Sequence, residues 1–224
     1  PGSTTKVVTM ATALETLGAD HRFRTRVYRT GPVLDGVVQG DLVLVAGGDP
    51  NLSGRERDGS YAFVDQDHSY GGQPLPTDPF TTLRRMAEQV AAKGIRAITG
   101  QVIVDASLFP EGEREGGTRV VISPVVVNDN VIDIVVTPGA HAGEPVRVVV
   151  SPETSLLTVQ AHVATADSGS QAALRAVEDS TNQDHRTLVL SGTVPVGPAS
   201  NRRWIVPVPS RFGEIAFAEV LGGA

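Results

Sequence analysis

Ser3 and Lys6 are the two residues whose types and spacing most directly suggest chemistry. They bound the tetrad Ser3-Thr4-Thr5-Lys6 at the expected start of a helix, where residues three apart share nearly the same face. A serine hydroxyl is a weak nucleophile until a base takes its proton, and a lysine amine does so when burial or nearby positive charge favours its neutral form. A helix N-terminus adds positive potential and N–H groups for an oxyanion. The tetrad therefore predicts acyl transfer, with Ser3 as nucleophile and Lys6 as general base.

The tetrad alone leaves the role of this serine open. A serine at the start of a helix most often serves only as an N-cap for a backbone N–H group. The members of a Ser-His-Asp triad need not be close in sequence, but the chain has no Gly-x-Ser-x-Gly segment to support one. The Ser-Lys pair and the N-cap are therefore the two alternatives that matter.

The five histidines have no spacing typical of a metal site, which needs convergent ligands. They are His21, His68, His141, His162 and His185. The densest polar cluster consists of Asp65, Asp67 and His68 in a Gly- and Pro-rich stretch, where a hydrated loop tip accounts for it. We therefore predict solvated or capping histidines and no metal site.

Apolar periodicity predicts a mixture of helices and strands. Helices are expected over residues 4–17, 80–92 and 212–221. Gly18 and Gly94 follow the first two and favour helix C-termini. Strands are expected over residues 22–29, 37–38, 42–46, 95–104, 119–137, 145–151, 156–164, 187–190 and 203–208. Residues 47–79 are expected to form a long surface loop. The pattern as a whole indicates an α+β fold.

Composition excludes several classes of protein. With 224 residues, of which 40% are hydrophobic, the chain can bury a sizeable core. A net charge of -6 and only 4% aromatic residues argue against nucleic-acid binding. The absence of cysteine excludes disulfides and thiol catalysis. No apolar run approaches the roughly 18 to 20 residues of a membrane span. The sequence starts at Pro1 without Met, so we expect residues to precede it.

A match much wider than the tetrad identifies a family. The run Pro1-Gly2-Ser3-Thr4-Thr5-Lys6-Val7-Val8-Thr9 is followed by Ala13-Leu14-Glu15-Thr16-Leu17-Gly18-Ala19-Asp20-His21-Arg22-Phe23. Together they resemble the nucleophile helix of class C low-molecular-mass penicillin-binding proteins, the DacB-like D-alanyl-D-alanine carboxypeptidases and endopeptidases. The match continues through Gly40-Asp41-Leu42, Gly47-Gly48-Asp49-Pro50, Gly94-Ile95, Thr99-Gly100, Asp105, Phe109, Asn128-Asp129-Asn130 and Ser191-Gly192-Thr193. The resemblance covers nearly the whole chain, as the N-terminal portion of such a protein.

The resemblance implies the start of a serine DD-peptidase/β-lactamase-like domain with inserted, strand-rich modules. Residues 1–27 are expected to form the nucleophile-helix part of the DD-peptidase domain. Residues 28–50 and 120–208 would form an inserted β-rich module, with residues 51–119 as a nested module. Residues 209–224 would return to the DD-peptidase domain, which is then truncated.

Two further catalytic motifs of the family, Ser-x-Asn and Lys-Thr-Gly, are not found in the family's position. In the family they follow a helix that resembles residues 212–221. Asn128-Asp129-Asn130 lacks the serine of Ser-x-Asn and falls between strand patterns, so we do not assign it to catalysis. We expect both motifs in sequence that follows Ala224, and the isolated chain is then expected to be inactive.

The resemblance implies a serine D-alanyl-D-alanine carboxypeptidase or endopeptidase acting on peptidoglycan stem peptides through a Ser3 acyl-enzyme. β-Lactam antibiotics would acylate the same serine, and the reaction would need no cofactor. A cell-envelope location, periplasmic or extracytoplasmic, is implied, with peripheral membrane or cell-wall association as an option and no prediction of oligomeric state. Two alternatives stay open: another Ser-x-x-Lys hydrolase such as an esterase, and a non-catalytic module that binds cell wall or protein.

Overall fold

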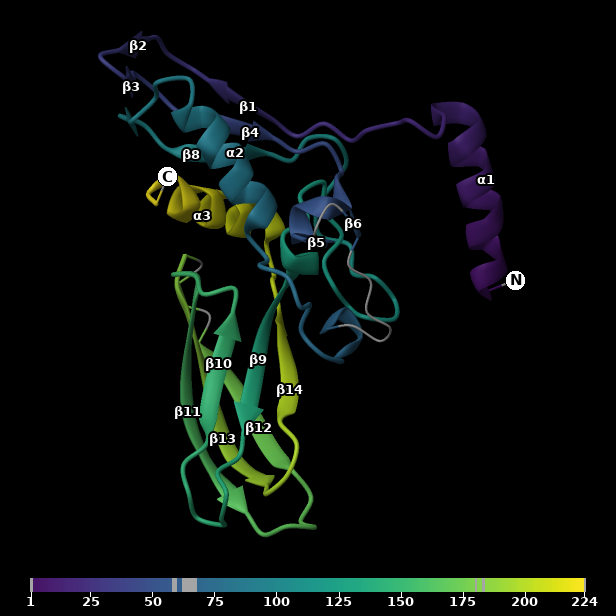
Figure 1. Ribbon diagram of the computed structural model, residues 1–224, viewed down its shortest axis with the longest axis vertical. Helices are drawn as coiled ribbons and strands as arrows, with labels where there is room; N and C mark the ends of the chain where they lie inside the picture. The colour runs from purple at the N-terminus through teal and green to yellow at the C-terminus, as the bar shows by residue number, and fades with distance from the viewer. Residues whose placement is uncertain (1, 58–59, 62–67, 180, 183, 224) are drawn as a thin grey trace.

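The computed structural model describes residues 2–57, 60–61, 68–179, 181–182 and 184–223. Helix α1 (Thr5–Leu17) stands apart from the rest of the chain, an α/β layer carries the other two helices, and a β-sandwich extends away from this layer (Figure 1). Helices and mostly antiparallel strands are combined in separate regions, as the predicted α+β class requires.

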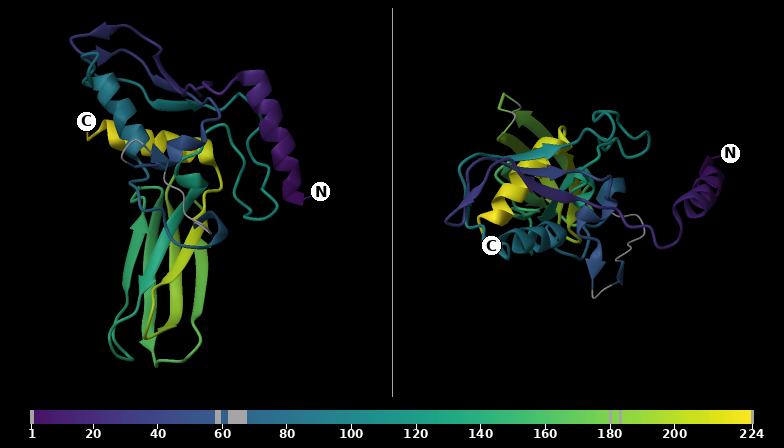
Figure 2. Two further views of the ribbon diagram at one scale, coloured as in Figure 1. Left: turned by 45° about the vertical axis from the view of Figure 1, so that its right-hand side comes forward. Right: turned by 90° about the horizontal axis from the view of Figure 1, so that it is seen from above.

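Helix α1 follows the short 3-10 helix η1 (Gly2–Thr4) and confirms the helix predicted over residues 4–17. It ends at Gly18, whose φ of 83° favours glycine and whose N–H donates to the Leu14 carbonyl at 3.0 Å. Two views show the helix projecting beside the body of the molecule (Figure 2). No residue of α1 is buried, so its apolar side has no packing partner within the described residues.

The α/β layer is organised around a three-stranded sheet. Strand β4 (Leu42–Val45) pairs antiparallel with β1 (Arg26–Arg29) and parallel with β8 (Val102–Asp105). Parallel strands need a crossover, and here the chain passes through helix α2 (Thr81–Ala91) between them. Helix α3 (Pro209–Leu221) packs on α2 and β8, and both helices contribute fully buried side chains to the core.

Short elements complete this layer. They are β2 (Val33–Leu34), β3 (Val37–Val38), β7 (Ala97–Ile98), η2 (Pro50–Ser53), β5 (Glu56–Arg57), β6 (Ser60–Tyr61), η3 (His68–Tyr70) and η4 (Asn128–Asn130). Strand β3 pairs antiparallel with β2 and parallel with β7, which extends the α/β layer away from the sandwich (Figure 1).

The sandwich consists of two three-stranded sheets. In one, β9 (Val131–Thr137) lies between β10 (Arg147–Ser151) and β14 (Ser200–Ile205), all antiparallel. In the other, β13 (Arg186–Pro195) pairs parallel with β11 (Leu157–Ala166) and antiparallel with β12 (Ala173–Asp179). Leu188, Leu190 and Val194 of β13 are buried at alternating positions, whereas β9 is buried on both faces over its first four residues. The indole N–H of Trp204 donates to Glu178 at 3.0 Å and links the two sheets.

Several strand predictions differ from the structure. Residues 95–104 form two strands because the chain turns at Gly100, where a Cβ would lie 2.1 Å from the Asp41 carboxylate. Residues 119–137 were expected to form consecutive strands broken at Asn128-Asp129-Asn130, and only the part after the break is a strand, β9, which begins at Val131 after three residues with positive φ. Strand β12 was not predicted, since nearly all its residues are exposed and apolar alternation is weak.

The prediction of a surface loop over residues 47–79 was partly wrong. Leu52 is 1% exposed and belongs to the main hydrophobic core, and Ser53 and His68 are buried as well. Asp49 accepts the N–H of Asn51 at 2.8 Å and caps η2, which turns Leu52 inward. Single buried anchors of this kind produce no periodic pattern in the sequence.

The predicted modules are connected closely in space. Strand β4 lies in the first range of the β-rich module and pairs with β8 of the nested module, while α3 of the last range packs on α2 and β8. The division at residues 27, 50, 119 and 208 stays a proposal about how the family's domains are arranged along this chain.

Candidate active site

The predicted nucleophile and base lie together at the start of α1. Ser3 is in η1 and Lys6 is in the first turn of the following helix. Lys6 Nζ donates a hydrogen bond to Ser3 Oγ at 3.1 Å. This separation is within the reach that a nucleophile and its general base need, although for proton removal the amine must accept rather than donate.

Ser3 does not occupy the N-cap position of α1. That position belongs to Thr4, whose side chain makes no capping hydrogen bond. The Ser3 hydroxyl is instead directed to the lysine one turn along the chain. The N-cap role for Ser3 therefore receives no support from the local geometry.

The surroundings of the pair are open to solvent. Ser3 and Lys6 are exposed, and so are the apolar side chains that follow them on the helix: Val7, Val8, Met10, Leu14 and Leu17 are 52% to 69% exposed. General bases and oxyanion sites gain strength when water is excluded. The described residues thus include Ser3 and Lys6 but do not shield them from water.

This exposure predicts that α1 is only marginally stable in the 224-residue chain. An isolated helix of fewer than about 12 to 15 residues is marginal in water, and packing of the apolar side supplies most helix stability in proteins. We expect amides of residues 5–16 to exchange with solvent near random-coil rates, while amides of β9 and β13 in the same sample are protected. Hydrogen-exchange mass spectrometry measures both. Protection of α1 equal to that of β9 in a monomer would contradict this expectation.

One carboxylate lies close enough to Lys6 to respond to its charge. The pKa of Glu115 is lowered to about 2, chiefly because the backbone N–H groups of Thr118 and Gly117 and the Thr118 hydroxyl donate to it. The Lys6 ammonium lowers the pKa further, by a smaller amount. The loop that carries Glu115 therefore faces the start of α1.

The depressed pKa predicts an acid-sensitive loop. The folded value of about 2 lies below the ordinary 4.5, so the carboxylate stabilises the loop fully above 4.5 and this contribution is lost as the pH falls through about 2. An NMR titration is expected to show the Glu115 carboxyl and the Gly117 and Thr118 amides titrating together near 2. In Glu115→Gln the two amides should stop titrating. A Glu115 midpoint near 4.5 would show that these hydrogen bonds are not formed in solution.

Comparison with known proteins places the chain in a family. Residues 1–208 match the family described as D-Ala-D-Ala carboxypeptidase 3 (S13). The chain belongs to this family. The family resemblance predicted from the sequence is thereby confirmed.

Two kinds of relative support the assignment of the S13 chain. The D-alanyl-D-alanine carboxypeptidase of Actinomadura sp. (strain R39) is 32% identical over 164 residues, which are 66% of this chain and 25% of that protein. The crystal structure of penicillin binding protein 4 (dacB) from Haemophilus influenzae matches 99% of this chain and 45% of its own, with a TM-score of 0.68 and 18% identity. Its complex with a novel β-lactam matches with a TM-score of 0.63 and 18% identity.

These relatives confirm the predicted fold class, and they are much longer than the S13 chain. The chain spans a quarter of the curated relative and 45% and 43% of the two solved chains. No helix among the described residues has the length and apolar character to cross a membrane.

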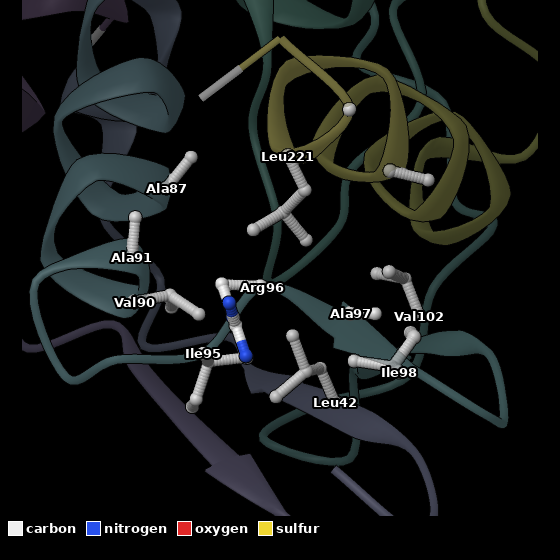
Figure 3. A pocket seen from close by; sticks show the side chains of 12 residues that line it. Leu42, Ala87, Val90, Ala91, Ile95, Arg96, Ala97, Ile98, Val102 and Leu221 are labelled. Atoms are coloured by element: carbon white, nitrogen blue, oxygen red, sulfur yellow. The ribbon is translucent and has the colours of Figure 1, made fainter. Parts of the chain in front are cut away.

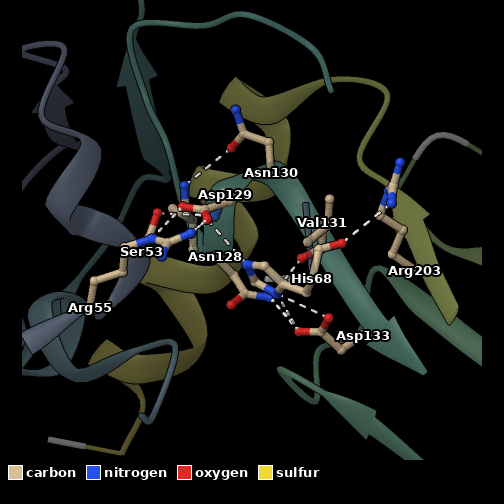
Figure 4. Close-up of polar contacts among 10 residues, drawn as sticks. Ser53, Arg55, His68, Asn128, Asp129, Asn130, Val131, Asp133 and Arg203 are labelled. Atoms are coloured by element: carbon tan, nitrogen blue, oxygen red, sulfur yellow. Dashed lines mark hydrogen bonds and ion pairs between the residues drawn. The ribbon is translucent and has the colours of Figure 1, made fainter. Parts of the chain in front are cut away.

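A second polar site in the S13 chain could not be recognised in the sequence. His68, predicted to be solvated or capping, is 1% exposed, and its Nδ1 lies 2.8 Å from Oδ2 of Asp133. Its Nε2 lies 3.2 Å from Asp129, which also pairs with Arg55 (Figure 4). Asp65 and Asp67 of the predicted cluster lie outside the described residues. The partners of His68 are more than 60 residues away, so no local spacing pointed to them.

The neighbouring Asn128-Asp129-Asn130 segment has a structural role in this network. All three residues have positive φ, which Asn and Asp tolerate better than other residues with a side chain. The Asn128 amide donates to Val131 O at 2.8 Å and to Asp133, and the Asn130 amide donates to Val121 O at 3.1 Å. These bonds hold the chain where β9 begins, which agrees with leaving the segment out of catalysis.

The sequence also contains one Ser-x-Asn tripeptide, Ser180-Thr181-Asn182, far from the position that the family uses. Ser180 lies outside the described residues. Asn182 is exposed in the connection between β12 and β13 and accepts the N–H of Asp184, and Asp184 pairs with Arg211 of α3. Asn182 thus lies in a connection of the sandwich rather than in the surroundings of α1. Among the described residues, no group of three His, Cys, Asp or Glu side chains could hold a metal ion.

The buried network predicts a large loss of stability when its histidine is removed. His68→Ala leaves Asp133 buried without its imidazole partner, and breaking a buried pair typically costs about 3–5 kcal/mol. Urea unfolding measures this loss. His162→Ala, a substitution of an exposed histidine on β11, should change stability by less than about 0.5 kcal/mol. Equal effects of the two substitutions would show that the network does not stabilise the fold.

Proposed function

We propose that the chain carries the nucleophile segment of a serine D-Ala-D-Ala carboxypeptidase, with endopeptidase activity on D-amino-acid cross-links as a further option. The observation that supports this most is the 3.1 Å hydrogen bond between Lys6 Nζ and Ser3 Oγ at the start of a helix. It occurs in a chain of the S13 family whose curated relative is a D-alanyl-D-alanine carboxypeptidase.

In the proposed reaction Ser3 Oγ attacks the carbonyl carbon of the terminal D-Ala-D-Ala bond while the neutral Lys6 amine takes the hydroxyl proton. The C–N bond breaks, and the proton passes to the nitrogen of the leaving D-alanine. Water then hydrolyses the Ser3 ester and restores the free hydroxyl. Positive potential at the N-terminus of α1 stabilises the oxyanion formed in each step.

The substrates proposed are peptidoglycan stem peptides, and the inhibitors are β-lactams. A β-lactam presents a strained ring carbonyl to the same serine. Support for the inhibitor comes from the structurally similar penicillin binding protein 4, whose complex with a β-lactam is known. Peptidoglycan lies outside the cytoplasm, so we propose a cell-envelope location.

Two measurements on a protein that joins this chain to a complete peptidase domain test the proposal: release of D-alanine from a D-Ala-D-Ala peptide and covalent labelling by a fluorescent penicillin. Both are expected. Absence of both from a folded protein would refute the function. The 224-residue chain alone is expected to show neither, since it contains no Lys-Thr-Gly and leaves its Ser-Lys pair open to solvent.

A further inference from the structure

An apolar cleft lies far from α1, between the C-terminal parts of α2 and α3. Its volume is about 400 Å³. Figure 3 shows Val90 and Ala91 of α2 on one side, Leu221 of α3 above, and Leu42 and Ile98 below. A cleft of this volume is within the usual range for small-molecule sites.

A second hollow of about 580 Å³ adjoins the first. It runs between β1 and α2, and the two hollows share Leu42, Val90 and Ile95 as lining residues. The shared residues are all aliphatic. Together the hollows form one surface along the C-terminal half of α2, apolar in the first hollow and mixed in the second.

The charges around this surface have one sign. Among the described residues that line the two hollows, the charged side chains are Arg96 in the first and Arg29 and Lys93 in the second, and no carboxylate lines either. Arg96 donates to the Asp35 backbone carbonyl at 2.7 Å, and Arg29 donates to the carbonyl of Gly31. Within the described part of the chain none of the three cations is in an ion pair, so their charges are available to an anion.

We propose that the two hollows form one binding site for a single-chain anionic amphiphile, of which a long-chain carboxylate is the simplest. The head group pairs with Arg29 and Lys93. The hydrocarbon chain lies over Leu42, Val90 and Ile95 and enters the cleft between α2 and α3. The positive charges favour an anionic head group, and the aliphatic lining favours a hydrocarbon tail. The site is separate from Ser3, and the proposal does not depend on the proposed peptidase function.

Isothermal titration calorimetry with dodecanoate, below its micelle concentration, tests this. We expect saturable binding, with octanoate weaker by about fourfold for each methylene removed. Dodecyltrimethylammonium, with the same hydrocarbon chain and opposite charge, should bind more weakly by about tenfold or more. Equal affinity for both head groups would overturn the proposal.

Two pairs of variants locate the site. Arg29→Gln with Lys93→Gln should weaken dodecanoate binding by about three- to tenfold, as expected for two exposed charge contacts. Arg175→Gln with Arg202→Gln removes two exposed arginines from the sandwich and should leave the affinity unchanged. Because Lys93 follows the C-terminus of α2, where a cation also stabilises the helix, thermal unfolding of both pairs must be compared.

Three further tests distinguish dodecanoate in the cleft from a second copy of the chain or from polypeptide of the peptidase domain. Ala91→Phe or Ala218→Phe places a ring in the cleft from an exposed position and should reduce affinity for dodecanoate more than for octanoate. Unchanged affinity in both would overturn the proposal. So would a dimer that dodecanoate does not dissociate, which would indicate a second copy in the cleft. Failure of the protein with a complete peptidase domain to bind dodecanoate would show that polypeptide fills the site.

Discussion

Replacing Ser3 by Ala is expected to abolish covalent labelling by a fluorescent penicillin in a protein that joins this chain to a complete peptidase domain. The label can form only through an ester with the attacking oxygen, and Ser3→Ala deletes that oxygen. Because alanine favours helix more than serine does, the substitution should not destabilise α1. D-Alanine release should fall to the background rate. In-gel fluorescence and intact mass measure the label, and the mass increase should match one penicillin per chain.

The matched control for Ser3 is Thr5→Ala. Thr5 is another exposed hydroxyl residue at the start of α1, and it is not three residues from Lys6. Thr5→Ala should label at a rate close to that of the parent. Label that survives in Ser3→Ala would exclude Ser3 as the nucleophile, and peptide mapping would then identify the residue that carries it.

Much of the local structure could be predicted because it depends on nearby residues. Helix α1 ends at Gly18 as predicted, since a residue with φ of 83° is marked in the sequence by glycine itself. The Ser3–Lys6 contact could also be predicted, because three residues along a helix fix the relative position of two side chains. Predictions of this kind need no knowledge of tertiary contacts.

The features that the sequence did not predict depend on contacts between residues distant in sequence. His68 is buried because Asp133 and Asp129 approach it from sequence positions more than 60 residues away. Strand β12 is specified by its backbone pairing with β13, and because nearly all its own residues are exposed, its sequence carries little apolar alternation. In both cases the stabilising partner is distant in sequence, and a single sequence does not reveal it.

Replacing Lys6 by Ala is expected to slow acylation by about 10² to 10⁴, the usual contribution of a positioned general base. The serine would remain, and its helix would keep its length, but the amine that lies 3.1 Å from Ser3 Oγ would no longer be there to take the proton. Stopped-flow measurement of penicillin labelling gives the acylation rate constant directly. It separates this step from binding and from hydrolysis of the acyl-enzyme, which a steady-state rate does not.

Lys6→Arg distinguishes a base from a positive charge. Arginine keeps the charge and much of the length of lysine, but it does not lose its proton in proteins. If Lys6 acts as the base, Lys6→Arg should be about as slow as Lys6→Ala, and raising the pH should restore neither. If the positive charge alone is needed, Lys6→Arg should acylate near the parent rate. Glu15→Ala, at the far end of the same helix, should match the parent throughout. A Lys6→Ala variant that acylates at the parent rate would exclude Lys6 from proton transfer and leave the helix N-terminus as the only activating feature of this segment.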